Sequence, residues 1–323
     1  MRKWLSAGIA LFALLVMNGP AMAKEFPEKP ITLVAPFPPG GIADILGRAS
    51  GAGAGKFLGQ TVAVLNKPGA GGTLGIDFLS QSKPDGYTLV GTGVTILALG
   101  MYTQDVKWTP EDFSLILGIC TYNNALVVPA DAPWKTFDEW VQYVKKNPGF
   151  KYGTYGALTE THLLMEWIAK RLDLKLIPVH FRGDPEGITN ILGGHVQAYA
   201  GAGGHVAQVR AGKLKTILQM MGEPADPDSK SVARIKDVLP DAPRQIVEFP
   251  YCIIAPKGVP EPVRKILHDA FKKGTVDNPE FVKAAETVNL AVQYHDPKDL
   301  EVKLREAHAL IGKLVKELGL ERK

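Results

Sequence analysis

The residues best suited to chemistry in this 323-residue chain are small, hydrogen-bonding residues gathered in five short loops. Each loop follows an apolar run and precedes a helical pattern, where exposed backbone N–H groups and helix N-termini bind anions. Glycines let a ligand approach the backbone closely, threonine hydroxyls are neutral hydrogen-bonding groups, and Arg182 and His162 could supply positive charge. The five loops are residues 38–41, 68–72, 91–95, 153–159 and 181–185.

This combination of groups suits an anion that is bound and released unchanged. For any single loop, the alternative that its glycines only form a tight turn weighs equally. The functional interpretation therefore rests on the recurrence of such loops after successive predicted strands.

The spacings that mark common catalytic and cofactor sites are absent from the sequence. None of the seven histidines has the neighbours of a zinc-hydrolase motif, and no serine has glycines two residues away on both sides. Residues 50–57 fail the phosphate-loop pattern, and Leu74 stands where a dinucleotide fingerprint needs glycine. We predict no catalytic residue, no metal and no cofactor. A secreted hydrolase or lyase using Thr154, His162 and Asp184 remains an alternative.

Alternating strands and helices must position the loops. Strands are predicted at residues 31–35, 61–65, 87–91, 151–154, 174–179 and 196–200. Helices are predicted from Asp44, which would cap the first, and at residues 73–82, 159–171 and 185–192; Thr136 and Glu139 form a capping box for another. The small residues 51–55 lie inside a helical pattern and predict close helix packing. This alternation predicts a parallel sheet with helices on both faces in each domain.

About 300 residues are more than one hydrophobic core usually holds, which predicts two lobes. The apolar runs 125–128 and 250–255 are predicted crossings between them. The first lobe then comprises residues 24–125 and 249–323, and residues 126–248 form an inserted second lobe. In the helical tail, Leu304, Ala307, Ile311, Leu314 and Leu318 are spaced to pack onto the first lobe.

The N-terminus is typical of a secretory signal peptide. Arg2 and Lys3 precede an apolar core at residues 5–17, and small residues follow at Ala21 and Ala23. The core is too short for a transmembrane helix, which needs about 20 apolar residues. We therefore predict that residues 1–23 are removed, that the mature protein begins at Lys24, and that it is periplasmic.

The charge balance argues against a nucleic-acid partner. Removal of Arg2 and Lys3 lowers the basic count from 37 to 35 against 33 acidic residues and leaves a net charge of +2. Nucleic-acid binders draw their affinity from a clustered basic excess. Cys120 and Cys252, the only two cysteines, fit no metal or redox spacing, and the sequence leaves open whether they form a disulfide or stay as free buried thiols.

Taken together, these loops resemble the substrate-binding receptors of tripartite tricarboxylate transporters, the TctC or Bug family, over essentially the whole mature chain. The resemblance rests on PFPPGGIAD at residues 36–44, NKPGAGG at 66–72, PDGYTL at 84–89, YGT at 152–154 with Thr159 and His162, LGGHV at 192–196 and RAGKL at 210–214. It implies an α/β, two-lobe periplasmic-binding-protein (Venus-flytrap) fold, each lobe a mostly parallel sheet flanked by helices.

The family resemblance also implies a function and a set of ligand-binding residues. The protein would be a monomeric receptor, not an enzyme, that captures a small di- or tricarboxylate and delivers it to the permease subunits of the transporter. Asp44 is expected to brace the first loop and not to touch the ligand. The implied ligand-binding site consists of Pro38, Gly40, Gly41, the bracing Asp44, Ala70, Gly71, Thr92, Thr154, Thr159 and His162, to which we add Arg182 on its position after a strand.

Several positions depart from the family pattern. Asn190, Gln197 and Gly201 stand where aspartates are common, the asparagine usual near Gly100 is absent, and Arg182 stands where lysine is common. Most of these changes lie in the inserted lobe, which selects the distal part of the ligand, so the identity of the acid stays open. A secreted ligand-sensing protein is the remaining alternative function.

Overall fold

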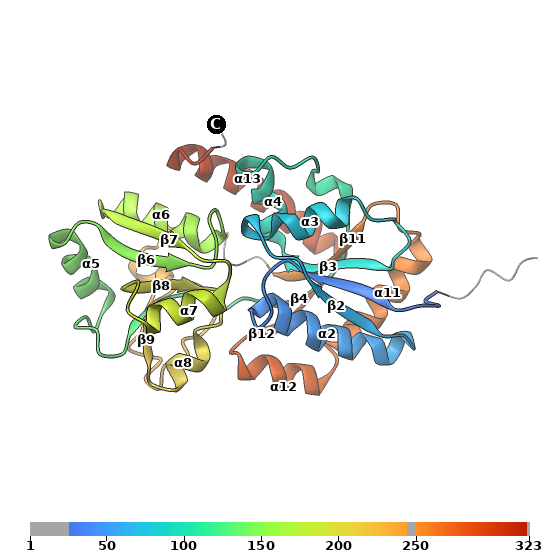
Figure 1. Cartoon of the computed structure of the whole chain (residues 1–323), viewed down its shortest axis with the longest axis horizontal. Helices are drawn as coiled ribbons and strands as arrows, with labels where there is room; N and C mark the ends of the chain where they lie inside the picture. The colour runs from blue at the N-terminus through green and yellow to red at the C-terminus, as the bar shows by residue number, and fades with distance from the viewer. Residues whose placement is uncertain (1–25, 244–247, 249, 322–323) are drawn as a thin grey trace, which may run out of the picture.

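Two α/β lobes lie side by side in the computed structural model, which describes residues 26–243, 248 and 250–321 (Figure 1). Each lobe is built on one six-stranded sheet. The predicted signal peptide, residues 1–23, and the predicted mature N-terminus at Lys24 lie outside the described residues. Within the described ranges, no helix combines the length and the apolar character that crossing a membrane requires.

The first lobe contains the sheet ordered β12-β4-β11-β3-β1-β2. Its strands are β1 Ile31–Ala35, β2 Val62–Asn66, β3 Thr88–Gly93, β4 Phe113–Thr121, β11 Tyr251–Pro256 and β12 Ala291–His295. Its helices are α2 Ile42–Leu58, α3 Thr73–Ser80, α4 Val94–Thr103, α11 Glu261–Gly274, α12 Pro279–Thr287 and α13 Pro297–Leu318, with short 3-10 turns η1 Ala70–Gly72 and η2 Pro110–Asp112.

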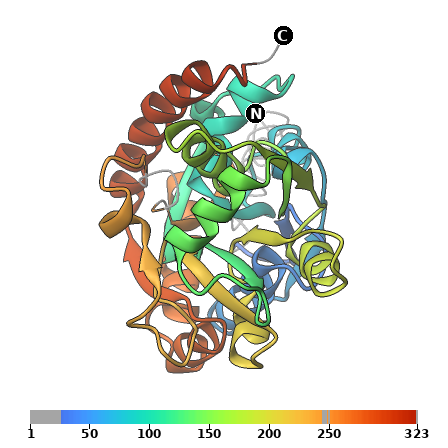
Figure 2. The same ribbon diagram turned by 90° about the vertical axis from the view of Figure 1, so that its left-hand side faces the viewer.

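The second lobe contains the sheet ordered β10-β9-β5-β8-β6-β7 and faces the viewer in Figure 2. Its strands are β5 Ala125–Pro129, β6 Phe150–Thr154, β7 Leu176–His180, β8 Ala198–Gly201, β9 Leu214–Gln219 and β10 Ala233–Arg234. Its helices are α5 Phe137–Lys146, α6 Glu160–Arg171, α7 Asp184–Leu192, α8 Val206–Arg210 and α9 Ile235–Val238. Ala125, which the predicted division gives to the first lobe, begins β5 of this second sheet.

The predicted two-lobe α/β fold is confirmed. Both sheets are mixed, and parallel pairs predominate only in the second sheet. The β-α-β units pair in parallel as predicted, for example β1 with β2 and β3, and β6 with β7 and β8. The strands next to the crossings run the other way: β11 is antiparallel to β3 and β4, and β5 is antiparallel to β8 and β9. A strand that enters a lobe from its neighbour starts at the end of the sheet where the other strands finish, so it pairs antiparallel.

The small residues of α2 allow close helix packing, as predicted. A Cβ at Gly53 would lie 1.9 Å from the carbonyl oxygen of Gly274, in α11. Only a residue without a side chain permits this approach. The small residues therefore serve packing and do not hold a phosphate.

Thr136 caps α5 as predicted, but Glu139 accepts from the residue before the cap, so the predicted capping box is only half formed. The Thr136 hydroxyl accepts a hydrogen bond from the Glu139 backbone N–H at 3.2 Å, and the Glu139 carboxylate accepts from the backbone N–H of Lys135 at 2.7 Å. Phe137, Trp140, Val141 and Val144 are buried on one face of the helix. Local capping and helical periodicity therefore predicted this helix correctly.

The chain first crosses between the lobes at residues 122–124, where buried amides form a network. The Nδ2 of Asn123 donates to the carbonyl oxygens of Glu223 at 2.7 Å and Asn289 at 3.2 Å. The Nε2 of Gln219 donates to Oδ1 of Asn123 at 3.1 Å. Both asparagines of the crossing, Asn123 and Asn124, are fully buried. This network ties the crossing to Gln219 at the end of β9 in the second lobe and to Asn289, just before β12 in the first.

The C-terminal helix α13 packs on the first lobe through its apolar face, as predicted. Leu304, Ala307, Ile311 and Leu314 are buried against α4 and β4. The end of α13 also reaches α6 of the second lobe, where the Lys170 amine donates to the Glu317 carbonyl oxygen at 2.7 Å (Figure 1). The helix therefore contacts both lobes.

The two cysteines are free and buried. Cys120 lies opposite Tyr251 on the neighbouring strand, whereas Cys252 lies opposite Gly118 and its thiol donates to the Thr92 carbonyl oxygen. Successive side chains of a strand point to opposite faces of the sheet. The two sulfurs therefore lie on different faces, which decides the question in favour of free thiols. Burial raises the pKa of the Cys120 thiol to about 12.

Candidate ligand-binding site

The first predicted loop connects β1 to the N-terminus of α2. The helix begins at Ile42 with Gly41 as its N-cap, so the prediction that Asp44 caps the helix is wrong by three residues. Asp44 instead lies inside the first turn, and its carboxylate accepts hydrogen bonds from the Gly40 backbone N–H and the Asn66 amide, both at 2.9 Å. The Asn66 amide also donates to the Phe37 carbonyl oxygen at 3.0 Å. Asp44 therefore braces the loop.

The electrostatics of Asp44 fit a bracing role. Burial raises the pKa of its carboxyl group, but the ion pair with Arg48 at 2.8 Å and the hydrogen bonds from Gly40 and Asn66 outweigh burial and lower the pKa. Asp44 is therefore a carboxylate at neutral pH. Its charge is fully engaged by neighbours in the first lobe.

The predicted loops of the two lobes meet across the gap between the sheets. A Cβ at Gly183 of the second lobe would lie 3.0 Å from Cδ of Pro38, and a Cβ at Gly40 would lie 3.9 Å from Cγ of Pro185. Around the second loop, Ala70 and Gly71 have positive φ values of 48° and 63°.

Gly71 makes the corresponding contact from the second loop. A Cβ there would lie 3.0 Å from the Ala157 carbonyl oxygen, which belongs to the second lobe. The structure therefore brings the first, second, fourth and fifth loops together with the lobes closed.

Thr92 is not among the residues that meet there. Its side chain is fully buried on the face of β3 that it shares with Cys252, and within the described chain its Oγ1 has no hydrogen-bond partner. The neighbouring Gly93 points to the other face, where it lines a cavity between the lobes. The alternation of side chains along a strand decides this difference.

In the second lobe, Thr154 and Thr159 shape their own loop. Both hydroxyls donate to the Gly156 carbonyl oxygen, at 2.9 and 3.0 Å. His162 accepts a hydrogen bond from the Leu158 backbone N–H at its Nδ1, at 3.0 Å. These three predicted residues lie together, but their polar atoms hold the loop in place.

His162 also belongs to a cluster of titratable side chains. Its ring centroid lies 4.5 Å from that of His180, and its Nε2 lies 3.6 Å from Glu166. Burial, and then the nearby His162, lowers the pKa of His180 to about 4. Burial raises the pKa of Glu166, but hydrogen bonds from His162 and Tyr152 outweigh it and lower the pKa. At neutral pH the cluster contains a neutral His180 and an ionised Glu166.

Arg182 is exposed and directly precedes Gly183, a contact residue of the fifth loop. Its backbone N–H donates to the Glu186 carboxylate at 2.8 Å. Among the described residues its guanidinium forms no ion pair, and Asp184 is held by other groups. Arg182 is therefore available at the edge of the gap between the lobes.

A cavity of about 20 Å³ lies between the lobes, roughly the space of one water molecule. Gly41 is the only one of the predicted site residues that lines this cavity. The other lining residues were not predicted as ligand contacts, although Gly93, Tyr155 and Asp184 lie in predicted loops and Glu160 follows Thr159 directly. The cavity is lined by Phe37, Gly41, Ile42, Ala43, Gly93, Ile96, Tyr122, Tyr155, Glu160, Asp184 and Ala202.

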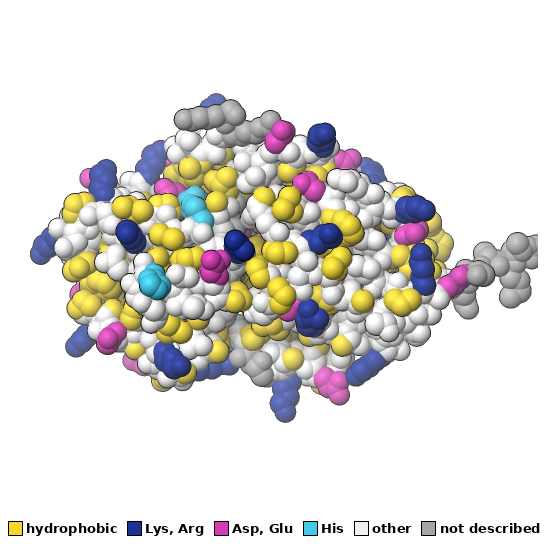
Figure 3. Space-filling model, viewed as in Figure 1, with side chains coloured by type: hydrophobic (Ala, Val, Ile, Leu, Met, Phe, Trp, Pro, Cys, Tyr) yellow, Lys and Arg dark blue, Asp and Glu magenta, His cyan; other side chains and the backbone are white. Residues whose placement is uncertain are grey.

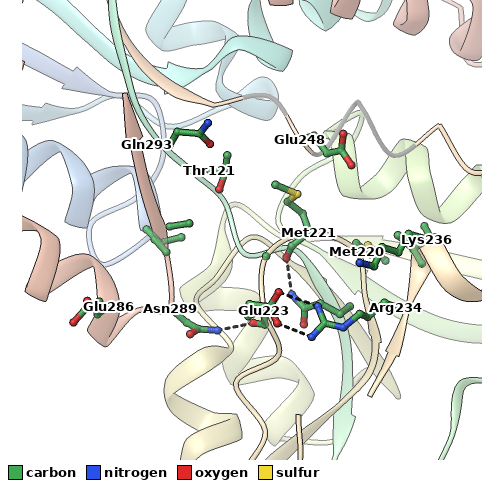
Figure 4. A pocket seen from close by; sticks show the side chains of 15 residues that line it. Thr121, Met220, Met221, Glu223, Arg234, Lys236, Glu248, Glu286, Asn289 and Gln293 are labelled. Atoms are coloured by element: carbon green, nitrogen blue, oxygen red, sulfur yellow. Dashed lines mark hydrogen bonds and ion pairs between the residues drawn. The ribbon is translucent and has the colours of Figure 1, made fainter. Parts of the chain in front are cut away.

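A larger pocket of about 500 Å³ lies beside the crossing segments (Figure 4). Glu223 and Arg234 face each other in it and form two hydrogen bonds, at 3.0 and 2.5 Å. The Asn289 amide donates to the Glu223 carbonyl oxygen at 2.5 Å. The arginine of this larger pocket is already paired with a carboxylate, and none of the predicted loops lines it.

The described residues offer little for binding a metal ion or a nucleic acid. No group of three or more His, Cys, Asp or Glu side chains in residues 26–243, 248 and 250–321 is placed to hold a metal ion. On the face drawn in Figure 3, basic and acidic side chains are scattered over both lobes without a large cluster of either sign. This face therefore lacks the basic patch of a nucleic-acid-binding surface.

Two mixed α/β lobes, linked by crossing segments and closed over a small cavity, define a periplasmic-binding-protein fold. The family model described as "Tripartite tricarboxylate transporter family receptor" matches residues 46–320. The chain belongs to this family of solute-binding proteins. The resemblance found in the loop motifs is thereby confirmed.

A curated relative supports the same assignment. The chain is 34% identical over 321 residues to the "UPF0065 protein in gbd 5'region" of Cupriavidus necator, covering 99% of this chain and 96% of that protein. A solved structure described as a periplasmic transporter is 27% identical, with a TM-score of 0.85, and covers 92% of this chain and 99% of the other.

Two more distant solved structures contain ligands and share the fold. A Rhodopseudomonas palustris protein with bound malate has a TM-score of 0.77 at 23% identity, covering 90% of this chain and 100% of its own. Another R. palustris protein, with adipate, has a TM-score of 0.81 at 20% identity, covering 91% and 99%.

Proposed function

We propose that this protein is a monomeric periplasmic receptor that closes its two lobes over a small carboxylate and delivers it to a tripartite tricarboxylate-type membrane transporter. The observation that carries the proposal is the meeting of the predicted loops around the cavity between the lobes. Gly41 and the following residues Ile42 and Ala43 bring the N-terminus of α2 to this cavity. The first N–H groups of a helix lack partners within it and attract anions.

The proposed receptor binds its ligand without transforming it. The hydroxyls of Thr154 and Thr159 already donate to the Gly156 carbonyl oxygen, so neither is positioned as an activated nucleophile. The family assignment and the ligands of the two R. palustris proteins support a small organic acid as the class of ligand.

A cognate carboxylate should raise the melting temperature of the purified protein by several degrees, because a ligand that binds only the folded, closed form stabilises it by mass action. A thermal-shift screen of mono-, di- and tricarboxylates, each beside its uncharged amide, measures this. Stabilisation by uncharged solutes but by none of the acids would contradict the proposal. Loss of uptake of the identified acid in cells lacking the protein tests delivery to a transporter.

Arg182→Met should weaken binding of the identified carboxylate by about tenfold, because an Arg–carboxylate contact is charge-assisted but Arg182 is exposed to water, which screens it. Methionine keeps an apolar stem of similar length, so the melting temperature of the ligand-free protein should not change. Isothermal titration calorimetry measures the dissociation constant. An unchanged constant would show that Arg182 does not contact the ligand.

A further inference from the structure

The walls of the cavity between the lobes are mainly apolar and aromatic. Phe37 of the first lobe and Tyr155 of the second contact each other edge to face, with ring centroids 5.8 Å apart. Tyr122, at the crossing, adds a third ring to the lining. Aromatic faces tolerate an apolar chain and attract a cation.

The charged side chains in this lining are both acidic. Glu160 and Asp184 are 5% and 4% exposed, and no Lys, Arg or His lies among the described residues that line the cavity. The cavity has room for about one water molecule in this structure, so a ligand must separate the two lobes slightly. It then meets two carboxyl groups in a poorly solvated space.

Asp184 is satisfied by its own lobe. Its carboxylate accepts hydrogen bonds from the Tyr199 hydroxyl at 2.7 Å and from the backbone N–H groups of Ala202 at 3.3 Å and Gly204 at 3.2 Å. The same packing fills the space beside Gly201, where a Cβ would lie 3.1 Å from the Asp184 carboxylate. Asp184 is therefore a fixed part of the wall.

Glu160 has fewer partners. It is the first residue of α6, and its carboxyl group is hydrogen-bonded by the Tyr155 hydroxyl and by its own backbone N–H. Burial, the largest influence, raises the pKa of Glu160 despite these hydrogen bonds, and nearby Asp184 raises it further. The end of α6 that would otherwise attract an anion is thus already occupied by the side chain of Glu160.

The two lobes consequently offer different chemistry to the two ends of a ligand. The N-terminus of α2 presents backbone N–H groups near Gly41, which suit a carboxylate. The second lobe presents the carboxyl group of Glu160 between aromatic rings, which suits a hydrogen-bond donor. An ammonium group bound there would favour the ionised form of Glu160. A second carboxylate would be repelled by that charge, because like charges interact strongly where water is excluded.

We propose, resting on the receptor function above, that the ligand is a small amino acid whose carboxylate binds the first lobe and whose ammonium group binds Glu160. Glu160 is then the residue that determines specificity against dicarboxylates. The aromatic rings of Phe37, Tyr122 and Tyr155 surround the ammonium end.

Calorimetry with probes of matched length tests this proposal. The first set is 4-aminobutanoate, glutarate and pentanoate, and the second is 3-aminopropanoate, succinate and butanoate; L-α-amino acids are titrated beside their deaminated acids. We expect an amino acid to bind the wild-type protein at least tenfold more tightly than its matched dicarboxylate and monocarboxylate. A dicarboxylate that binds more tightly than every amino acid would overturn the proposal.

The variant Glu160→Gln separates charge from shape, because glutamine keeps the size of the side chain and an oxygen for Tyr155. It should weaken amino-acid binding at least tenfold and narrow or reverse the preference over the matched dicarboxylate. Asp138→Asn, an exposed acid on α5 of the same lobe, is the control and should leave both constants unchanged. An unchanged preference in Glu160→Gln would reject the role of Glu160.

The outcomes distinguish this proposal from the receptor function itself. If the wild-type protein binds dicarboxylates best, the receptor function stands and the amino-acid proposal fails. If no probe with a carboxylate binds, the receptor function fails as well. Should Glu160→Gln not fold, the order of affinities in the wild-type protein decides the proposal.

Discussion

Gly183→Leu should weaken binding of the cognate acid by about one to two powers of ten while leaving both lobes folded. Gly183 has a φ of 167°, an extended conformation that any residue adopts, so leucine causes no backbone strain. Its Cβ would nevertheless lie 3.0 Å from Cδ of Pro38 in the opposite lobe. The larger side chain therefore acts as a wedge between the lobes.

The size of this effect follows from the cost of overpacking. Extra methylene groups in a close contact cost roughly 1–3 kcal/mol, and each 1.4 kcal/mol is a tenfold change in affinity. The apparent affinity falls with the fraction of protein that can close. Isothermal titration calorimetry measures the change.

Thr189→Leu, at an exposed position on the same helix, is the control for added bulk and should bind the acid normally. Each variant should unfold at nearly the wild-type temperature without ligand. A normal dissociation constant for Gly183→Leu would mean that the contact between Pro38 and Gly183 is absent from the ligand complex.

The free energy of unfolding should fall as the pH is lowered from 6.5 to 4. His205→Leu should remove about 3 kcal/mol of this fall. His205 is 1% exposed, and burial lowers the pKa of its imidazole from 6.5 to about 4. Its Nδ1 has no hydrogen-bond partner among the described residues. The folded state therefore holds this side chain neutral.

The sign follows from proton binding. Between pH 6.5 and about 4 the unfolded chain binds a proton at His205 and the folded chain does not, so the free energy of unfolding falls as the pH falls. A difference of about two pKa units or more, at 1.36 kcal/mol each, gives the stated magnitude.

Urea unfolding of the wild-type and His205→Leu proteins at pH 7.5, 6.5, 5.0 and 4.0 measures this difference. His195→Gln, at an exposed histidine, controls for loss of an imidazole and should follow the wild-type curve. Parallel curves for wild type and His205→Leu would show that His205 takes up a proton without unfolding.

Local signals predicted most of the secondary structure. The strand at Ile31–Ala35 has the predicted bounds, and helix α3 begins at Thr73 and ends two residues earlier than predicted. Side-chain periodicity and capping act within a few residues, so the sequence contains them directly. Local signals do not predict the direction of β11. That direction depends on pairing with β3 and β4, which lie more than 120 residues earlier in the chain.

The candidate site was predictable only at the level of its loops. The junctions that carry Gly41, Gly71 and Gly183 do meet between the lobes, since the carboxyl ends of parallel strands share an edge of the sheet. The bracing role of Asp44 was also anticipated. Thr92, in contrast, lies on the opposite face of its strand from the cavity.

The sequence by itself determined the family, the alternation of strands and helices, and the glycine-rich loops at the strand ends. Only the tertiary structure decided which polar groups remain for a ligand. Thr154 and Thr159 use their hydroxyls within their own loop, and the buried Glu160 lines the cavity instead. Hydrogen bonding and burial depend on residues that are distant in sequence and close in space, so the chemistry of the cavity appears only once both lobes are folded and closed.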